Sequence, residues 1–322
     1  MIRHILVPID GSKLAECVLP HAISFAKAFK AKITLLRIMD PEIDIAGKRT
    51  PIKPFDWRMY QTEAEIYLSS IQKQFQELGI DAEYYILEGA FSERIIDYAK
   101  KAEVDFLIIS SHGQSGHSGW NVSSNVQRIL INIFKPILII RATLLECDRN
   151  IPHVYKKIVI PLDLSQRAEC ALSTVTWIAR LFHATLIPLY LVNKPEMPSR
   201  IPLSDKDKLL LTSITERNRQ EAESYLAQLK NRMDSDEYTF VPHIITCESI
   251  SNSLHDYIAK SNIDLVAFCA HGFSGKSHLP FSSLVTNFIA FGTTPLLIIQ
   301  DMTPEKVKKT MGYLSNLQQK GH

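Results

Sequence analysis

The segment Asp105–Ser124, DFLIISSHGQSGHSGWNVSS, decides the fold that we expect for this chain. It begins with an apolar run typical of a buried strand and continues as a loop rich in Ser, Gly and His. It ends at Ser123 and Ser124, which open a pattern of helical spacing. A strand, a glycine-containing loop and a helix N-terminus together present backbone N–H groups and a positive dipole end to an anion. The segment therefore predicts an anion-binding loop at the end of a strand.

The same arrangement returns 159 residues later as Asp264–Ser283, DLVAFCAHGFSGKSHLPFSS. Shorter motifs repeat as well. The tripeptide Ala-Glu-Cys occurs at 15–17 and 168–170, and a Pro-x-Asp-x-Ser motif occurs at 8–12 and 161–165. A period near 150 residues indicates two copies of one domain rather than a solenoid of short repeats. We attribute the Ala-Glu-Cys repeat to common ancestry and to one face of a helix.

Hydrophobic runs typical of strands alternate with segments of helical spacing in both halves of the chain. Strands that follow one another through helices form parallel sheets with right-handed connections. The pattern predicts an α/β fold of two tandem doubly wound domains, each with a five-stranded, mostly parallel sheet flanked by helices. We expect a first domain over 1–145, a second over 154–302, and a polar C-terminal tail over 303–322.

The apolar runs of the first half are short and nearly unbroken, as is typical of strands that are buried on both faces. They predict strands over 3–9, 32–39, 82–88, 106–109 and 137–140. The segments between them predict helices over 14–29, 56–78 and 91–102, and a further helix that begins near Ser123. In the second half, a long helix is expected over 205–232.

Composition narrows the function classes. Lys and Arg number 36 against 34 Asp and Glu, so the sequence predicts no positive electrostatic field that would attract nucleic acid. No apolar run reaches the roughly 18–20 residues that a membrane span needs, and the opening MIRHILVPID predicts a strand rather than a signal peptide. The five cysteines are odd in number and form no C-x-x-C pair, which favours reduced thiols in a cytoplasmic protein.

Two loops should meet at the ligand site of each domain. Ligands of doubly wound sheets bind at the carboxyl ends of the strands, where the strand order reverses. One loop follows the first strand and carries Asp10 or Asp163. The other follows the fourth strand, and we call it the first glycine loop (111–122) or the second glycine loop (270–281). An aspartate facing a glycine loop suits a nucleotide, because the carboxylate accepts from ribose or base and the loop amides hold phosphate.

Three motifs resemble those of the universal stress protein family: VPIDGS at 7–12, SSHGQSG at 110–116 and PILIIR at 136–141. The resemblance covers both halves and implies a tandem member with the fold of the adenine nucleotide alpha hydrolases. The family's ATP-binding branch carries the loop pattern G-x2-G-x9-G-(S/T). This chain reads Ser110-x2-Gly113-x9-Ser123-Ser124 in the first half and Cys269-x2-Gly272-x9-Ser282-Ser283 in the second, so only the middle glycine is present in each.

The resemblance implies that the chain binds ATP or a related adenine nucleotide, with Mg as its counterion, and acts as a stress-response regulator. Ser110 and Cys269 add side chains where the family's backbone comes close to the nucleotide. The first half is the better candidate, because its loop keeps more glycines and lacks Phe273 and Pro280. The implied nucleotide contacts are Pro8, Asp10, Ile38, Ser110, His112, Gly113, Ser123 and Ser124 in the first half, and Pro161, Asp163, Leu191, Cys269, His271, Gly272, Ser282 and Ser283 in the second.

Each of these residues also has a purely structural interpretation, which remains an alternative to nucleotide binding. The two aspartates are also suited to capping the helices that follow them, and Ser123-Ser124 would then be plain N-caps. The two histidines would be loop residues without a catalytic task. The segment AHGFSGKS at 270–277 comes close to a P-loop pattern, but it follows the fourth strand of its domain, and no common zinc spacing occurs among the His and Cys residues. We expect no metal site.

Two other functions remain alternatives: a nucleotide-free signalling or scaffold protein of the same fold, and a slow ATPase. No set of nucleophile, base and orienting residue emerges, so we name no catalytic residue and do not expect an efficient enzyme. The family also pairs two domains through their last strands. That would set 136–141 against 295–300 within this chain and cover two apolar edges. A further homodimer is compatible with this pattern, and nothing in the sequence specifies it.

Overall fold

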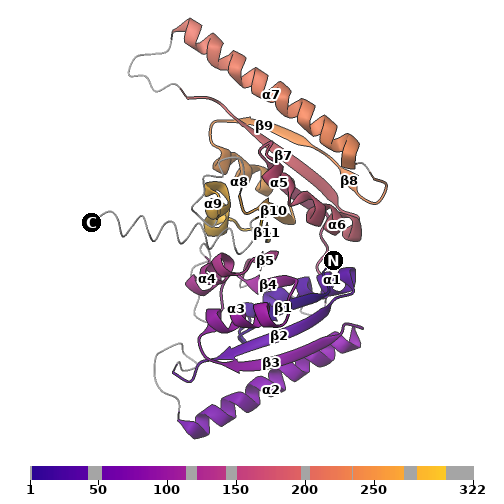
Figure 1. Cartoon of the computed structure of the whole chain (residues 1–322), viewed down its shortest axis with the longest axis vertical. Coiled ribbons are helices and arrows are strands. Elements are labelled where there is room, and N and C mark those ends of the chain that lie inside the picture. The colour runs from indigo at the N-terminus through magenta and orange to yellow at the C-terminus, as the bar shows by residue number, and fades with distance from the viewer. Residues whose placement is uncertain are drawn as a thin grey trace, which may run out of the picture. The chain divides into compact units, whose positions relative to one another are not determined.

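A computed structural model describes residues 2–42, 53–113, 122–142, 151–196, 204–233, 235–271 and 281–301 of the chain. In it, the repeated strand–helix pattern forms two compact units. Unit 1 contains the described residues up to Val154 together with the segment from Ile289 to the last described residue, and unit 2 contains Tyr155–Phe288. Figure 1 labels most elements of both units.

Unit 1 is a doubly wound sheet with the strand order β3-β2-β1-β4-β5-β11. All neighbouring strands are parallel except β11, which runs antiparallel to β5 with Leu297 opposite Leu138. The pairing predicted between 136–141 and 295–300 is therefore present. The elements of this unit are β1 (His4–Pro8), η1 (Ala15–Val18), α1 (Leu19–Phe29), β2 (Lys32–Met39), α2 (Pro54–Glu77), β3 (Ala82–Glu88), α3 (Phe91–Lys101), β4 (Phe106–Ser110), α4 (Ser124–Asn132), β5 (Ile137–Ile140) and β11 (Leu296–Ile299).

Unit 2 repeats the arrangement, with the order β10-β6-β7 and the strands β8 and β9 both paired in parallel with β7. β8 and β9 replace one continuous strand because Pro242 lies between them and has no N–H for the ladder. The elements are β6 (Lys157–Leu162), α5 (Gln166–Glu169), α6 (Leu172–Phe182), β7 (Thr185–Asn193), α7 (Asp205–Met233), β8 (Thr239–Phe240), β9 (His243–Cys247), α8 (Ile250–Ser261), β10 (Leu265–Cys269) and α9 (Ser283–Phe291), whose last residues are grouped with unit 1.

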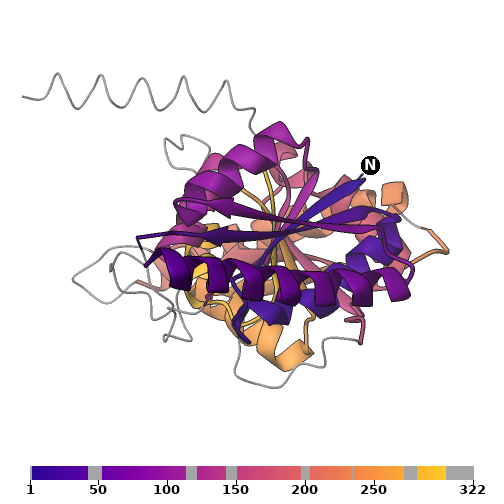
Figure 2. The same ribbon diagram turned by 90° about the horizontal axis from the view of Figure 1, so that it is seen from below.

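Helices cover both faces of the unit 1 sheet, with α2 on one face and α3 on the other (Figure 2). β1 and β4 are consequently buried along their whole length. Phe25 of α1 stacks on Phe106 of β4 with ring centroids 5.1 Å apart, and both side chains are fully buried. Burying one such side chain contributes about 1.5–3 kcal/mol. The predicted α/β class and the doubly wound, mostly parallel sheets are confirmed.

The first connection of unit 1 differs from the single helix expected over 14–29. The structure has a short 3-10 helix, η1, followed by α1, which begins at Leu19. Pro20 occupies the first turn of α1, where its missing N–H costs nothing, whereas inside a continuous helix it would remove a backbone hydrogen bond. Proline therefore divides the segment and leaves η1 packed against β4.

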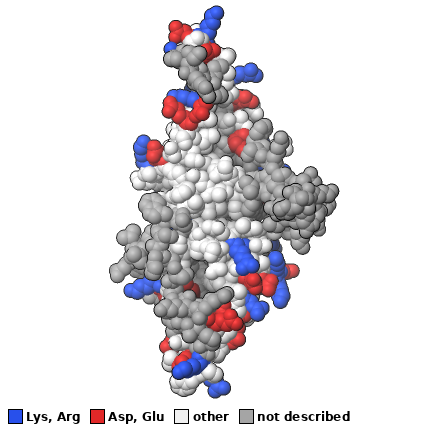
Figure 3. Space-filling view, turned by 90° about the vertical axis from the view of Figure 1, so that its left-hand side faces the viewer, with Lys and Arg blue, Asp and Glu red and all other residues white. Residues whose placement is uncertain are grey.

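Surface charge agrees with the balanced composition. On the face that Figure 3 shows, the described Lys and Arg side chains lie close to Asp and Glu side chains, and much of the described surface carries neither charge. Across the described part of the chain, no helix combines the length and the apolar character that crossing a bilayer requires.

Candidate functional site

The sheet order of unit 1 creates a switch point between β1 and β4. The chain runs outward from β1 to β2 and β3, then returns to the other side of β1 to form β4 and β5. β1 and β4 lie in parallel register, with Leu6 opposite Leu107. The loops that follow these two strands therefore leave the same edge of the sheet, which is where ligands of such sheets bind.

Asp10 and Gly113 meet at this edge. An ideal Cβ built on Gly113 would overlap Asp10 Oδ2 and would lie 3.2 Å from Asp10 Cγ. Because real Cβ atoms essentially never come so close to another heavy atom, only glycine fits beside the carboxylate without a shift of the backbone or of Asp10. The structure thus brings together the two predicted residues that belong to different loops.

The Asp10 carboxylate also shapes the loop that follows β1. Its Oδ1 accepts a hydrogen bond from the Ser12 N–H over 2.9 Å, and Ser12 Oγ accepts from the Ala15 N–H at the start of η1. In unit 2, Asp163 Oδ1 accepts from both the N–H and the hydroxyl of Ser165. Ser165 is the N-cap of α5. In unit 2, Ser165 rather than Asp163 therefore caps the following helix, and in unit 1 Ser12 rather than Asp10 accepts the N–H of Ala15.

Ser110, which departs from the family's loop pattern, turns toward the interior of unit 1. Its side chain is buried, and its hydroxyl donates to the His112 carbonyl over 2.6 Å and to the Leu14 carbonyl over 3.3 Å. The Cys17 thiol in turn donates a hydrogen bond to Ser110 Oγ over 3.6 Å. The extra side chain is thus held by hydrogen bonds to η1 and to its own turn.

His112 is a buried neighbour of the site. Its Nδ1 lies 3.1 Å from Ser111 Oγ, which also accepts a hydrogen bond from the Ala142 N–H. Burial lowers the pKa of His112, and the nearby Arg141 lowers it further, so its imidazole is neutral at pH 7. A neutral ring that bonds its own loop fits the structural reading of this histidine. His271 of unit 2 is buried as well, with 2% of its surface exposed.

Two arginines near the loops were not singled out by the sequence analysis. An ideal Cβ on Gly11 would lie 2.8 Å from Arg37 Nη1, which places this guanidinium beside the β1 loop. Arg141 donates to the Ile289 carbonyl over 2.9 Å, and burial lowers its pKa to about 10, so it stays charged at pH 7. Both arginines lie at or near the carboxyl ends of apolar strands. That position in the sequence could have indicated that they lie near the ligand site.

The glycine loops of the two units close in the same way. The Ser123 N–H donates to the Ser111 carbonyl over 3.1 Å, and the Ser282 N–H donates to the Ala270 carbonyl over 2.9 Å. Each serine hydroxyl then accepts from the N–H three residues on, at Val126 and at Val285. Both serines act as N-caps, which brings the start of α4 and of α9 close to the end of the preceding strand.

Some of the remaining predicted contacts lie at the same edge of the sheets, and others lie outside the described residues. Those within strands lie toward the carboxyl ends, and Ser124 and Ser283 begin α4 and α9. Gly272, most of both glycine loops and the tail 303–322 lie outside the described residues. The predicted residues in strands are Pro8 in β1, Ile38 in β2, Ser110 in β4, Pro161 in β6, Leu191 in β7 and Cys269 in β10.

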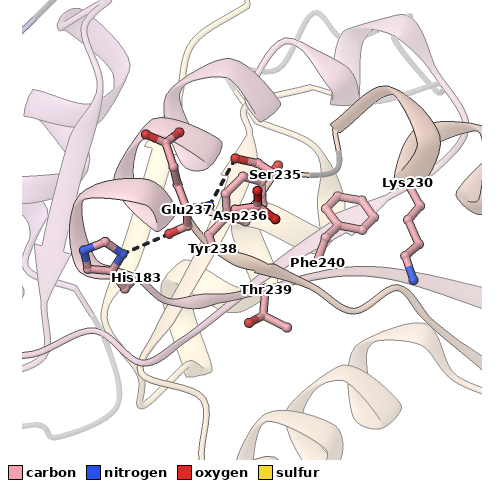
Figure 4. A pocket seen from close by; sticks show the side chains of 8 residues that line it. All are labelled: His183, Lys230, Ser235, Asp236, Glu237, Tyr238, Thr239 and Phe240. Carbon is pink, nitrogen blue, oxygen red and sulfur yellow. Dashed lines mark hydrogen bonds between the residues drawn. The ribbon is translucent and has the colours of Figure 1, made fainter.

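Two cavities among the described residues lie at the opposite edge of the sheets. One of about 460 Å³ is lined by the end of α7 and the segment leading into β8, and His183 Nδ1 lies 3.0 Å from the Glu237 carbonyl there (Figure 4). Another of about 1160 Å³ in unit 1 includes Arg3, Lys32 and Lys135, at the amino ends of strands. Neither cavity includes a predicted contact. In the part of the chain described, no three His, Cys, Asp or Glu residues form a metal-binding group.

The fold and this edge define an α/β protein of the doubly wound class with its candidate ligand site at the switch point. The model of the universal stress protein family matches residues 1–141 and again residues 154–300. The chain belongs to the universal stress protein family and carries two copies of its domain.

Known relatives resemble each half or the whole chain. Universal stress proteins MJ0531 and MJ0577 of Methanocaldococcus jannaschii are 23% and 24% identical over 141 and 155 residues, each matching 44% of this chain and 83% and 96% of their own lengths. A universal stress protein structure from Archaeoglobus fulgidus covers 92% of this chain and 96% of its own, at 14% identity and a TM-score of 0.64. One from Pseudomonas aeruginosa covers 98% of both chains, at 15% identity and a TM-score of 0.64. These structures share the tandem fold.

Proposed function

We propose that this chain binds ATP or a related adenine nucleotide at the switch point of unit 1, and that it acts as a cytoplasmic stress-response regulator. One observation carries the proposal: the Asp10 carboxylate lies against the Gly113 backbone, where a Cβ would overlap Oδ2. The carboxylate offers an acceptor for ribose hydroxyls. The glycine beside it has no side chain, so the loop amides can approach a phosphate.

Charge around the site supports an anionic ligand. Arg37 lies beside the Gly11 turn, and Arg141 is charged and half-buried next to His112. The N-terminus of the nine-residue helix α4 adds the positive end of a helix dipole at Ser123. A Mg²⁺ ion would come with ATP, since this ion keeps several waters and is commonly held through substrate phosphates.

Unit 1 is the better nucleotide site of the two. Its Ser110 hydroxyl is held inside the domain by carbonyl groups, so the backbone at this position keeps its approach to a ligand. In unit 2, the corresponding Cys269 contacts another thiol, and Asp163 Oδ1 accepts two hydrogen bonds from Ser165. These differences favour a nucleotide-free role for unit 2, in signalling or as a scaffold.

Regulation would follow from differential affinity. A nucleotide that binds one conformation more tightly than another shifts the population toward it, and a partner protein then reads that shift. Turnover is not needed for this role, and slow ATP hydrolysis would be a side activity. Comparing phosphate release between wild type and Asp10→Ala tests that side activity directly.

ATP binding by wild type, Asp10→Asn and Asp163→Asn, measured by isothermal titration calorimetry, tests the proposal. Asparagine keeps an oxygen that accepts from the residue 12 or residue 165 N–H but removes the charge. We expect Asp10→Asn to weaken ATP binding at least about tenfold, which is a loss of about 1.4 kcal/mol of binding free energy. Asp163→Asn should leave the affinity unchanged. No binding by wild type at millimolar ATP, or equal affinity in Asp10→Asn, would overturn the proposal.

Mass spectrometry of small molecules released from denatured, freshly purified protein provides a second test. Co-purified ATP or ADP should be present in wild type and absent from Gly113→Val, whose branched side chain would fill the space beside Asp10. Nucleotide that persists in Gly113→Val would move the site to unit 2.

A further inference from the structure

We propose that Cys170 and Cys269 of unit 2 are a redox modification site, which a peroxide converts to a reversible intradomain disulfide beside the second glycine loop. The inference goes beyond nucleotide binding and does not depend on it. It rests on the position of the two thiols, on their different exposure, and on the contrast with the same positions in unit 1.

The two sulfur atoms are already in contact. Cys170 Sγ lies 2.9 Å from Cys269 Sγ, although the residues are 99 positions apart in the chain. Cys170 is the C-cap of α5, and Cys269 is the last residue of β10, whose backbone is paired in register with β6. A disulfide bond is about 2.05 Å long, so the sulfurs need to approach by less than about 1 Å. Small side-chain rotations supply such a shift.

Exposure assigns an order to the reaction. Cys170 is partly exposed, whereas Cys269 is buried, with 6% of its surface accessible. The Cys170 thiol gives up its proton, and the thiolate attacks one oxygen of hydrogen peroxide. The O–O bond breaks, the departing hydroxide takes up that proton, and a sulfenic acid and one water result. Cys269 then attacks that sulfur and displaces a second water. In total, two thiols lose two protons and two electrons, and one peroxide becomes two waters. A dithiol reductant reverses the bond by thiol exchange.

Unit 1 has the same geometry without the second thiol. Cys17 occupies the place of Cys170 in the Ala-Glu-Cys repeat, and its Sγ lies 3.6 Å from the Ser110 hydroxyl oxygen. A hydroxyl cannot close a disulfide, so oxidation should be confined to unit 2. A metal site is a weaker reading of the thiol pair, since the residues that the structure covers contain no group of three potential ligands.

The bond would join the first helical segment of unit 2 to the strand that opens the second glycine loop. Ala270 follows Cys269 directly, and its carbonyl accepts from the Ser282 N–H at the other end of that loop. Oxidation would therefore constrain one anchor of the loop, and the cross-link would reduce the conformational freedom of the unfolded chain. We expect oxidised wild type to show a higher unfolding temperature than reduced wild type.

The test treats wild type, Cys170→Ser, Cys269→Ser and Cys247→Ser with hydrogen peroxide and then labels remaining thiols with a maleimide in denaturant. Wild type and Cys247→Ser should lose two labels, and their digests should contain a peptide linked between Cys170 and Cys269. Neither linked peptide nor unfolding-temperature shift should occur in Cys170→Ser or Cys269→Ser. Dithiothreitol should restore both labels in wild type.

Ser110→Cys provides a gain of function that does not depend on removing a thiol. Placing a thiol opposite Cys17 should yield a second linked peptide and the loss of four labels in total. Retention of all labels in oxidised wild type would overturn the inference, as would disulfides that join Cys147 or Cys247 instead. Because the readout is a mass, it stays informative even if the protein binds no nucleotide.

Discussion

The Tyr67 hydroxyl on α2 donates a hydrogen bond to Glu16 Oε1 in η1 over 3.0 Å, and Tyr225 on α7 donates to Glu169 Oε1 over 2.9 Å. The Ala-Glu-Cys repeat thus has a structural meaning in both units: its glutamate ties down the long helix, and its cysteine faces the end of β4 or β10. Each long helix buries only a narrow stripe of side chains, so this bond supplements thin packing. The stripes are Ala64, Leu68, Ile71 and Phe75 on α2, and Ala222, Leu226 and Leu229 on α7.

Removing either tyrosine hydroxyl should lower the unfolding free energy of its unit, and the loss should be larger in unit 1. Glu16 is buried, whereas the Glu169 side chain is 26% exposed and also contacts Arg232 over 3.3 Å. Tyr67→Phe should therefore cost about 2 kcal/mol and Tyr225→Phe about 1 kcal/mol or less, because a buried carboxylate that loses a donor pays a larger desolvation penalty. Urea unfolding of both variants measures the difference. Equal losses would contradict the assignment.

Stability should fall in mild acid because of His21. This ring is buried on α1 with its centroid 4.2 Å from that of His153. Burial, and to a smaller extent His153, lowers the pKa of His21 from 6.5 to about 3. Between these two values, the unfolded chain binds a proton that the folded chain does not, so stability drops by about 1.4 kcal/mol per pH unit as the pH falls below 6.5.

His21→Phe keeps a buried ring but cannot titrate, which isolates this contribution. From pH 7.5 to pH 4.5, wild type should lose about 2–3 kcal/mol more of its unfolding free energy than the variant. Denaturant titrations of both proteins at the two pH values give that difference. Parallel pH profiles for wild type and variant would show that His21 does not carry the effect.

Gly113→Ala should weaken ATP binding about tenfold or more, because the added Cβ overlaps Asp10 Oδ2 and forces the carboxylate or the loop to move. Gly79→Ala is the matched control. Gly79 follows α2 with a φ of +76° and open space around its Cα, so alanine there strains the backbone by about 1 kcal/mol without approaching the site. The control should lower the unfolding temperature but keep the affinity. Weaker ATP binding in both variants would mean that affinity follows stability rather than the contact.

Ser165→Ala should destabilise unit 2 by about 0.5–2 kcal/mol through loss of the α5 N-cap. It also removes the hydroxyl that donates to Asp163 over 2.5 Å. Ser69→Ala, at an exposed position of α2, should stay within about 0.5 kcal/mol of wild type. Chemical denaturation of the three proteins decides the matter, and equal stability of all three would refute the capping role.

The sequence predicted the parts of the fold that depend on local pattern. Short apolar runs such as 106–109 identify strands that helices cover on both faces, and the repeated motifs identify two copies of one domain. It also placed Asp10 and Gly113 after the first and fourth strands, and the switch-point rule then predicted their meeting. Pro20 and Pro242 carried signals for the two interruptions, of the first helical segment and of the strand that became β8 and β9.

Only the tertiary structure decided which side chains touch across those elements. It showed that Ser110 turns inward, that Ser12 and Ser165 rather than the aspartates accept the first helical N–H groups, and that two thiols 99 residues apart come into contact. Periodicity is a property of neighbouring residues, and a sequence displays it directly. Contacts between distant side chains depend on strand register, on the path of each loop and on rotamers, which are fixed only when the whole domain packs.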